Sequence, residues 1–176
     1  MADHRLTGVL LVGGASERFG SPKALARLGG RTLAEIGWQT LAFCDERIAV
    51  GKIADGIELP FPLLDDGTDV RAPIAGVVAG LRAAGHELSV VLPVDAPRVT
   101  AETLGTLAAR CADAAVPQTG PLPGAYRKSA LPALEAALAA GRLALREAIA
   151  ALEVVQVDID PALLANVNTP DDLARV

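Results

Sequence analysis

The sequence predicts an α/β fold: a single Rossmann-like domain with a mostly parallel central sheet and helices on both faces. Short apolar runs alternate along the chain with stretches of helical periodicity, which is the pattern of strand–helix–strand units. Runs such as residues 9–12 and 88–92 are almost continuously apolar, as expected for strands buried on both faces. A chain of 176 residues is also long enough for one two-sided core, so we expect one domain over residues 1–176.

Seven apolar runs are expected to form strands, most of them ending at a glycine or a turn. Pro60 and Pro62 interrupt the third run, which predicts an edge or irregular strand, because proline lacks the N–H that an inner strand donates. The expected strands are residues 9–12, 47–50, 59–64, 88–92, 114–118, 124–126 and 153–157.

Capping and terminating residues mark the helices between these strands. Thr32, Thr100 and Thr169 can each cap a helix N-terminus with the side-chain oxygen, and Pro73 suits the first position of a helix. Gly141 can end a helix in the left-handed conformation. The expected helices are residues 32–43, 73–84, 100–113, 129–140 and 143–150, with a last one that begins at residue 170.

Composition and charge exclude several classes of protein. The net charge of −5 argues against a nucleic-acid partner, which requires a basic face. No apolar run approaches the roughly 20 residues of a membrane span, and residues 1–5 lack the apolar core of a signal peptide. The two cysteines, Cys44 and Cys111, are too far apart for a metal motif or a disulfide framework. We therefore expect a cytoplasmic protein that binds neither membranes nor nucleic acid.

The loop after the first expected strand has the composition of a phosphate-binding loop. Gly13 and Gly14 let a ligand approach the main chain closely, and Arg18 and Lys23 supply two cations nearby. Backbone N–H groups and cations in such a loop suit a polyphosphate. The spacing matches neither the Walker loop nor the dinucleotide fingerprint, and a tight turn with solvated charges is the alternative interpretation.

Asp95 is the candidate metal ligand. It follows the apolar run 88–92 and is flanked by Pro93 and Pro97, so its carboxylate is held at the carboxyl end of a strand. Mg²⁺ prefers such oxygen ligands and usually keeps waters and substrate phosphates as well. An aspartate in a simple turn or at a helix N-cap is the alternative. If the strands at 9–12 and 88–92 are neighbours where the strand order reverses, Lys23 and Asp95 face one crevice.

These motifs resemble those of a known superfamily. The loop after the first strand is similar to the signature loop of the sugar-nucleotidyltransferase-like superfamily, and most similar to that of the molybdenum cofactor guanylyltransferases. The residues that carry this resemblance are Leu11, Val12, Gly13, Gly14, Arg18, Phe19, Gly20 and Lys23. The segments 72–76, 92–97 and 166–173 resemble further motifs of the same family, and they follow one another in the same order as in that family. The resemblance implies a nucleotide-diphospho-sugar transferase-like fold.

The resemblance also implies roles for single residues. Asp65 matches the family's aspartate that contacts the guanine nucleotide, although Asp66 leaves room for a shift by one residue, and a simple turn is the alternative. The segment 123–127 resembles the region that faces the acceptor. Arg127 and Lys128 could meet a phosphate there, or they could simply be solvated surface charges.

The activity implied by the resemblance is Mg²⁺-dependent transfer of GMP from GTP to molybdopterin-bound molybdenum, with release of pyrophosphate. In that reaction Leu11, Val12, Gly13, Gly14, Lys23, Asp65 and Asp95 would bind the nucleotide, Arg18 and Lys23 would act as catalytic cations, and Asp95 would hold Mg²⁺. Self-association and weak contacts with other proteins of cofactor biosynthesis or with molybdoenzymes are compatible with this role.

Two alternatives stay open from the sequence. Ser16 and the segment 21–23 also resemble the loop of the cytidylyltransferases that act on the same cofactor. The chain could instead be a noncatalytic nucleotide-binding module of the same fold, although Lys23 and Asp95 favour an enzyme.

Overall fold

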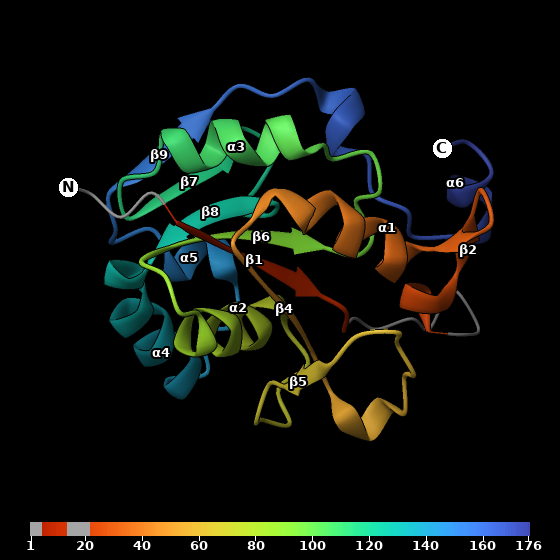
Figure 1. Ribbon diagram of the computed structural model, residues 1–176. Helices are drawn as coiled ribbons and strands as arrows, with labels where there is room; N and C mark the ends of the chain where they lie inside the picture. Colours follow the sequence, from red (N-terminus) through yellow and green to blue (C-terminus); the bar gives the residue numbers. More distant parts are fainter. Residues whose placement is uncertain (1–4, 14–21) are drawn as a thin grey trace.

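The computed structural model describes residues 5–13 and 22–176 (Figure 1). A seven-stranded sheet with the order β5-β4-β1-β6-β8-β7-β9 forms its centre. The strands of this sheet are β1 (Leu6–Leu11), β4 (Glu46–Gly51), β5 (Leu63–Asp65), β6 (Leu88–Pro93), β7 (Ala114–Pro117), β8 (Gly124–Arg127) and β9 (Val154–Val157). A separate two-stranded hairpin consists of β2 (Arg27–Leu28) and β3 (Arg31–Thr32).

The sheet is parallel except at one strand. β1 pairs in parallel with β4 on one side and with β6 on the other, and β5 extends the sheet beyond β4. β8 runs antiparallel to both of its neighbours, β6 and β7, whereas β9 is again parallel to β7. This mostly parallel sheet confirms the fold class predicted from the sequence.

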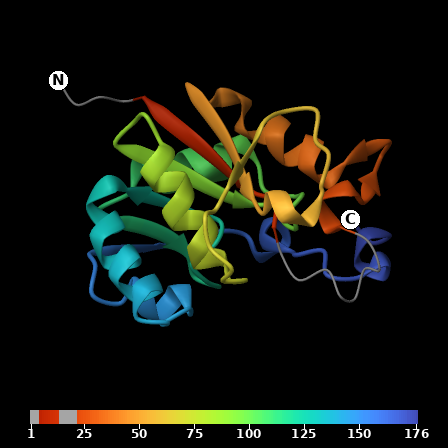
Figure 2. The same cartoon turned by 90° about the horizontal axis from the view of Figure 1, so that it is seen from below.

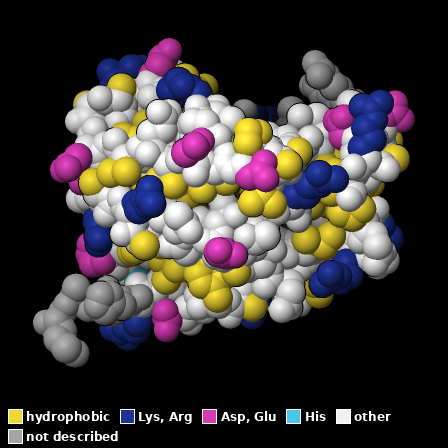
Figure 3. Space-filling view, turned by 90° about the horizontal axis from the view of Figure 1, so that it is seen from above, with side chains coloured by type: hydrophobic (Ala, Val, Ile, Leu, Met, Phe, Trp, Pro, Cys, Tyr) yellow, Lys and Arg dark blue, Asp and Glu magenta, His cyan; other side chains and the backbone are white. Residues whose placement is uncertain are grey.

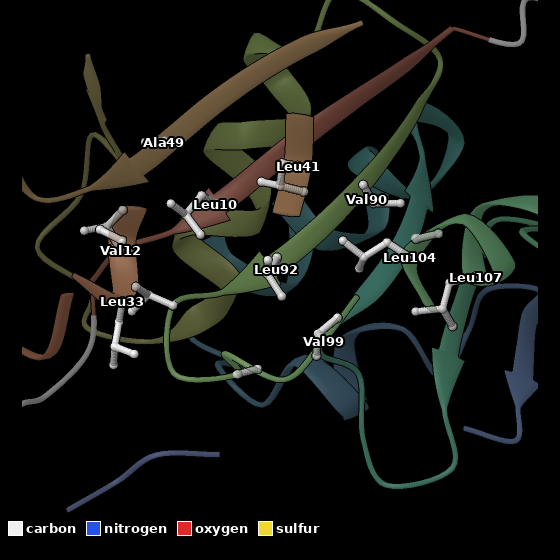
Figure 4. Packing of buried hydrophobic residues seen from close by; sticks show 14 of the residues in the cluster. Leu10, Val12, Leu33, Leu41, Ala49, Val90, Leu92, Val99, Leu104 and Leu107 are labelled. Carbon is white, nitrogen blue, oxygen red and sulfur yellow. The ribbon is translucent and has the colours of Figure 1, made fainter. Parts of the chain in front are cut away.

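Helices cover both faces of the sheet and bury two hydrophobic clusters against it. α1 and α3 lie on one face, and α2 and α4 lie on the other (Figures 1 and 2). On the α1 and α3 side, Leu10 and Leu92 from the central strands pack with leucines such as Leu33 and Leu104 (Figure 4). The helices are α1 (Leu33–Thr40), α2 (Pro73–Ala83), α3 (Ala101–Ala109), α4 (Leu131–Ala139), α5 (Leu145–Ala148) and α6 (Pro170–Leu173). Within the described residues, no helix is long and apolar enough to cross a bilayer.

Glycines let two helices pack unusually close to β1. A Cβ added at Gly80 of α2 would lie 2.5 Å from Cγ1 of Val9, and one added at Gly76 would lie 2.9 Å from Cδ2 of Leu11. On the opposite face, a Cβ at Gly37 of α1 would lie 2.6 Å from Cδ1 of Leu10. β1, the strand before the predicted phosphate-binding loop, is therefore closely packed by a helix on each face.

Several predicted element boundaries are confirmed. Thr32 and Thr169 each form a capping box, and the Thr100 hydroxyl accepts from the Thr103 N–H at the start of α3. Gly141 follows α4 in the left-handed conformation, with φ of 73°. The third expected strand is an edge strand, as predicted, and starts only after Pro62.

Two predicted helices are too long. The helix expected to run to residue 113 ends at Ala109, and Asp113 instead lies directly before β7. The Asp113 N–H donates to the Glu153 carbonyl, and its carboxylate accepts from the Glu153 N–H and from the Ser129 hydroxyl. The helix expected over residues 143–150 is limited to Leu145–Ala148.

Candidate active site

An open pocket of about 240 Å³ lies at the carboxyl ends of the parallel strands β1, β4 and β6. In Figure 1 the arrowheads of β1 and β6 point to the side of the molecule that carries β2 and α6. The strand ends contribute apolar and glycine residues to the wall, the start of α2 contributes Pro73 and Gly76, and Leu122 enters from the segment before β8. Open parallel sheets bind their ligands in a crevice at the carboxyl ends of their strands.

The main chain at the end of β1 is held close to its neighbours. The Val12 N–H donates to the Val50 carbonyl at 2.9 Å, and the Val94 N–H donates to the Leu11 carbonyl at 3.0 Å. A Cβ added at Gly51 would lie 3.5 Å from the Gly13 backbone nitrogen. Leu11, Val12 and Gly13, which are three of the predicted nucleotide-binding residues, line the pocket. Gly14 and Arg18, also predicted there, lie outside the described residues.

Lys23 and Asp95 lie close together at the carboxyl ends of the central strands. The Lys23 Nζ lies 3.4 Å from Oδ2 of Asp95, and the two side chains are 16% and 25% exposed. The predicted adjacency of the two strands is confirmed, since β1 and β6 pair along their whole length. The same Nζ donates to Oδ1 of Asn168 at 3.0 Å. A cation, a carboxylate and an amide from three distant segments therefore converge at one place.

The segment before α6 is fixed so that Asn168 can reach Lys23. The Val167 N–H donates to the Asp95 backbone carbonyl at 2.7 Å. The Asp172 carboxylate accepts from the N–H groups of Asn168 and Thr169, and these bonds lower the pKa of Asp172. The residues after Asn168 therefore form a tight cap, which holds the Asn168 amide against the pocket.

Two more cation–carboxylate pairs line the other side of the pocket, after β4 and β5. The Lys52 Nζ lies 2.9 Å from Oδ1 of Asp66, and both side chains are nearly buried. Arg71 pairs with Asp55 at 2.8 Å, and its own side chain is 58% exposed. Sequence reasoning did not single out Lys52 or Arg71. The position of Lys52, directly after the glycine that ends a parallel strand, is a signal that could have identified it.

The two neighbouring aspartates at the end of β5 differ in their surroundings. Both oxygens of Asp65 accept backbone N–H groups, from Ile53 and from Gly67, each at 2.8 Å. These bonds lower the pKa of Asp65. Asp65 is exposed next to the pocket, whereas Asp66 lines it. The contact of Asp65 with the nucleotide stays a prediction.

The suggested acceptor contacts at Arg127 and Lys128 are wrong for this pocket. β8 runs antiparallel to β6 and places Arg127 opposite Leu88, at the amino end of β6. The Arg127 Nε donates to the Cys111 carbonyl at 3.3 Å, and Lys128 follows it at the same edge of the sheet. Both cations therefore lie at the end of the sheet opposite to Asp95. From the segment around β8, Leu122 lines the pocket instead.

Figure 3 shows a face of the molecule that carries charged side chains of both signs. Basic and acidic side chains are interspersed over that face, with hydrophobic side chains between them. In the pocket, three cations and three carboxylates from separate segments are brought together. Each of these cations is paired with one of these carboxylates, so an anionic ligand would have to replace a carboxylate at a cation.

Comparison with known proteins identifies the family. The model of the MobA-like NTP transferase domain matches residues 8–157 of the chain. The chain belongs to the MobA-like NTP transferase family. The matched range includes the pocket residues on β1, β4 and β6, together with Lys23 and Asp95, whereas Asn168 lies beyond it.

Individual members of the family are similar over almost the full length. A probable molybdenum cofactor guanylyltransferase of Deinococcus radiodurans is 36% identical over 97% of this chain and 93% of the relative. A protein of Chloroflexus aggregans with the same description is 32% identical over the same shares of both chains. Among solved structures, molybdopterin-guanine dinucleotide biosynthesis protein A from Archaeoglobus fulgidus is similar with a TM-score of 0.79 and 30% identity, covering 96% of this chain and 95% of that one.

These findings confirm three predictions from the sequence. The resemblance to the molybdenum cofactor guanylyltransferases is confirmed by the named relatives, and the chain is an enzyme of the nucleotidyltransferase class. The nucleotide-diphospho-sugar transferase-like fold is confirmed by the solved structure of the Archaeoglobus protein.

Proposed function

We propose that this member of the MobA-like family transfers GMP from GTP to molybdopterin-bound molybdenum. The observation that carries the proposal is the convergence of Lys23, Asp95 and Asn168 at the carboxyl ends of β1 and β6. The names of the relatives in Deinococcus and Chloroflexus support guanine as the base and the molybdenum cofactor as the acceptor.

The proposed reaction is an in-line displacement at phosphorus. An oxygen of the acceptor's terminal phosphate attacks the α-phosphorus of GTP, and a new P–O bond forms. The bond from the α-phosphorus to the oxygen that bridges to the β-phosphate breaks, and pyrophosphate leaves with that bond's electron pair. Because the acceptor supplies the nucleophile, the protein contributes positioning and neutralisation of charge.

The cations and the backbone of the first loop would bind the phosphates. Gly13 lines the pocket, and Gly14 is the next residue in the sequence. Lys23 would neutralise charge that grows on the α-phosphoryl group and on the leaving pyrophosphate, and we propose the same role for Arg18. The Asn168 amide, which contacts the Lys23 Nζ, would keep the ammonium directed into the pocket.

Asp95 fits the requirements of a magnesium ligand. The described residues contain no group of three or more His, Cys, Asp or Glu side chains that could hold a metal by themselves. Mg²⁺ in nucleotide sites, however, is usually held by one or two carboxylates together with substrate phosphates and water. The half-buried Asp95 carboxylate lines the pocket and supplies one such ligand. When bound, Mg²⁺ would neutralise negative charge on the triphosphate.

We propose that the guanosine lies between β1 and the end of β5. Leu11 would pack against the nucleoside, and Asp65 or its neighbour Asp66 would accept from the N1–H and 2-amino groups of guanine. A carboxylate has about four lone-pair sites, so Asp65 keeps capacity beyond its two backbone partners. Cytosine offers only one amino donor on its pairing edge, so this arrangement favours GTP.

Side-by-side transfer from labelled nucleotides tests the proposal. Purified protein is incubated with Mg²⁺, molybdenum-loaded molybdopterin and either [α-³²P]GTP or [α-³²P]CTP, and both the labelled product and the released pyrophosphate are measured. We expect label in the cofactor from GTP, with one pyrophosphate per transfer. Preferential transfer from CTP would assign the protein to the cytidylyltransferases. Tight GTP binding without transfer from either nucleotide would support a noncatalytic module.

A further inference from the structure

Arg71 lies on the side of the pocket opposite to Lys23. Lys23 and Asp95 belong to the β1 and β6 side, whereas Asp55 follows β4 and Arg71 precedes α2, beyond β5 in sequence. In the sheet order β5-β4-β1-β6, β4 lies next to β1 and two strands from β6. With about 4.8 Å between neighbouring strands, those strands are roughly 5–10 Å apart. A ligand whose phosphates lie at Lys23 would extend its other end towards Arg71.

Lys52, the other cation on this side, has no donor left for a ligand. Its Nζ donates to both oxygens of Asp66, at 2.9 and 3.0 Å, and to the Thr68 carbonyl. An ammonium group has three N–H donors, so these contacts account for all of them. Lys52 therefore shapes the pocket wall by holding residues 66–68.

Arg71 differs because its pairing leaves one edge of the guanidinium open. Nη1 donates to Oδ2 of Asp55 at 3.3 Å, and Nη2 donates to Oδ1 at 2.8 Å, which is an end-on pair. A guanidinium has five N–H donors in a rigid planar fork. Within the described part of the chain, the Nε–H and the second N–H of Nη2 keep their capacity, and they lie parallel along the other edge. The side chain is 58% exposed and lines the pocket.

We propose that Arg71 is a specificity-determining residue that donates two parallel hydrogen bonds to O6 and N7 of the guanine of GTP. The proposal rests on the function proposed above and names the group that recognises the base. Asp55 acts as a positioning residue, because its carboxylate fixes the plane of the guanidinium by the end-on pair. That pair also keeps the pKa of the Asp55 carboxyl below its ordinary range.

The chemistry of the bases explains why guanine suits this group. Guanine presents two adjacent acceptors, O6 and N7, and arginine binds them in a bidentate manner. Adenine places an amino donor beside N7, which would face the donors of Arg71, and cytosine has no atom that corresponds to N7. The carboxylates at the end of β5 would read the opposite, donor-bearing part of guanine. The two sets of contacts are complementary, so a single base satisfies both.

Nucleotide analogues can isolate this contact. GTP, 7-deaza-GTP, which lacks the N7 acceptor, and ITP, which lacks the 2-amino group, are compared in the wild type and in Arg71→Ala. Binding is measured by calorimetry without the acceptor, and kcat/KM is measured with it. In the wild type we expect 7-deaza-GTP to bind about 5- to 100-fold more weakly than GTP. In Arg71→Ala that ratio should fall close to 1, while the ratio of GTP to ITP stays at its wild-type value.

Two further variants serve as controls. Arg71→Lys keeps the positive charge but loses the parallel donors, so it should fail to restore the penalty for 7-deaza-GTP. Arg82→Ala removes another exposed arginine, one that pairs with Glu135 at 2.6 Å outside the pocket, and should leave all nucleotide ratios unchanged. Thermal unfolding of each variant shows whether the fold is retained.

The outcomes separate this proposal from the proposed function. If GTP is preferred to CTP but the penalty for 7-deaza-GTP is absent in the wild type or unchanged in Arg71→Ala, the role of Arg71 is refuted and the guanylyl transfer stands. If Arg71→Lys restores wild-type GTP binding, Arg71 acts as a charge on a phosphate and the base contact is likewise refuted. If the wild type prefers CTP, the proposed function fails, and the proposal for Arg71 fails with it.

Discussion

The Lys23 ammonium lies 3.4 Å from Oδ2 of Asp95, although the two residues are 72 positions apart in the chain. In this arrangement the cation and the carboxylate neutralise each other. In the proposed reaction, a nucleotide phosphate at Lys23 would supply a new anion for the ammonium, and a metal ion at Asp95 would supply a new cation for the carboxylate. Either ligand would thus weaken the Lys23–Asp95 pair and leave the other side chain more available to the second ligand. Binding of nucleotide and of metal should therefore be coupled.

Asp95→Asn should abolish Mg²⁺-dependent turnover while the protein stays folded. A neutral amide is a poorer ligand for a hard cation than a carboxylate is. The measurement is the transfer rate as a function of Mg²⁺ concentration, with circular dichroism as a check of folding. Asp69→Asn, at an exposed residue before α2, is the matched control and should behave like the wild type. Near-normal rates of Asp95→Asn at ordinary Mg²⁺ concentrations would refute the role as metal ligand.

Lys23→Ala should lower the maximal rate by about 10²–10³ if the ammonium acts on charge that develops during the reaction. Steady-state kinetics with GTP separate this effect on kcat from an effect on KM. Lys128→Ala removes a lysine at the opposite edge of the sheet and should leave both constants unchanged. A loss confined to KM would make Lys23 a binding group without a role in the transition state.

Gly80→Ala should destabilise the fold by about 1–3 kcal/mol, because the new methyl group would collide with the buried, β-branched Val9. Gly105→Ala is a matched control in another helix, where an added Cβ meets no atom of the described residues within 4 Å. That substitution should stabilise the protein by about 0.4–1 kcal/mol through the lower entropy of the unfolded chain. Urea unfolding measures both, and equal effects of the two substitutions would contradict the close packing of α2 on β1.

Glu46 should make stability depend on pH in the acidic range. Burial raises the pKa of Glu46, but hydrogen bonds from the Gly85 N–H and the Thr7 hydroxyl, together with the nearby His86 and Lys128, outweigh burial, and the pKa of Glu46 lies below its ordinary value of 4.5. A lowered pKa in the folded state means that the stabilisation is complete above pH 4.5 and is lost as the pH falls through the folded-state pKa.

The test is the difference in unfolding free energy between the wild type and Glu46→Gln, measured from pH 7 to pH 3. We expect a difference that is largest at pH 7 and shrinks below pH 4.5. Glu58→Gln, at an exposed position before β5, is the control for loss of one negative charge. A difference that stays constant over the whole range would show that the ionised carboxylate of Glu46 adds no stability.

Much of the site was predictable because its residues belong to short sequence motifs that follow buried, apolar strands. The apolar runs locate β1 and β6, and the sequence motifs that follow these strands contain Lys23 and Asp95. The threonine caps identify the starts of α1, α3 and α6, because a cap is a contact between residues three positions apart.

The parts that sequence reasoning missed depend on strand direction and on long-range pairing. Nothing in residues 124–127 reveals that β8 runs against its neighbours, and this reversal moves Arg127 and Lys128 to the edge opposite the pocket. The Arg71 guanidinium is oriented by its ion pair with Asp55, which lies 16 positions earlier and after a different strand. Such pairs carry no periodic signal, so the structure was needed to find them.

The hydrogen bond from Val167 to the Asp95 carbonyl links the pocket to a part of the chain that has little structure of its own. α6 has four residues, and most of the surrounding side chains are half-buried or exposed. Segments of this kind open locally at a small fraction of the free energy of global unfolding. Each opening would withdraw Asn168 from Lys23 while the sheet stays intact. Amide hydrogen exchange at Val167 would therefore report how often the active site is fully assembled, independently of turnover.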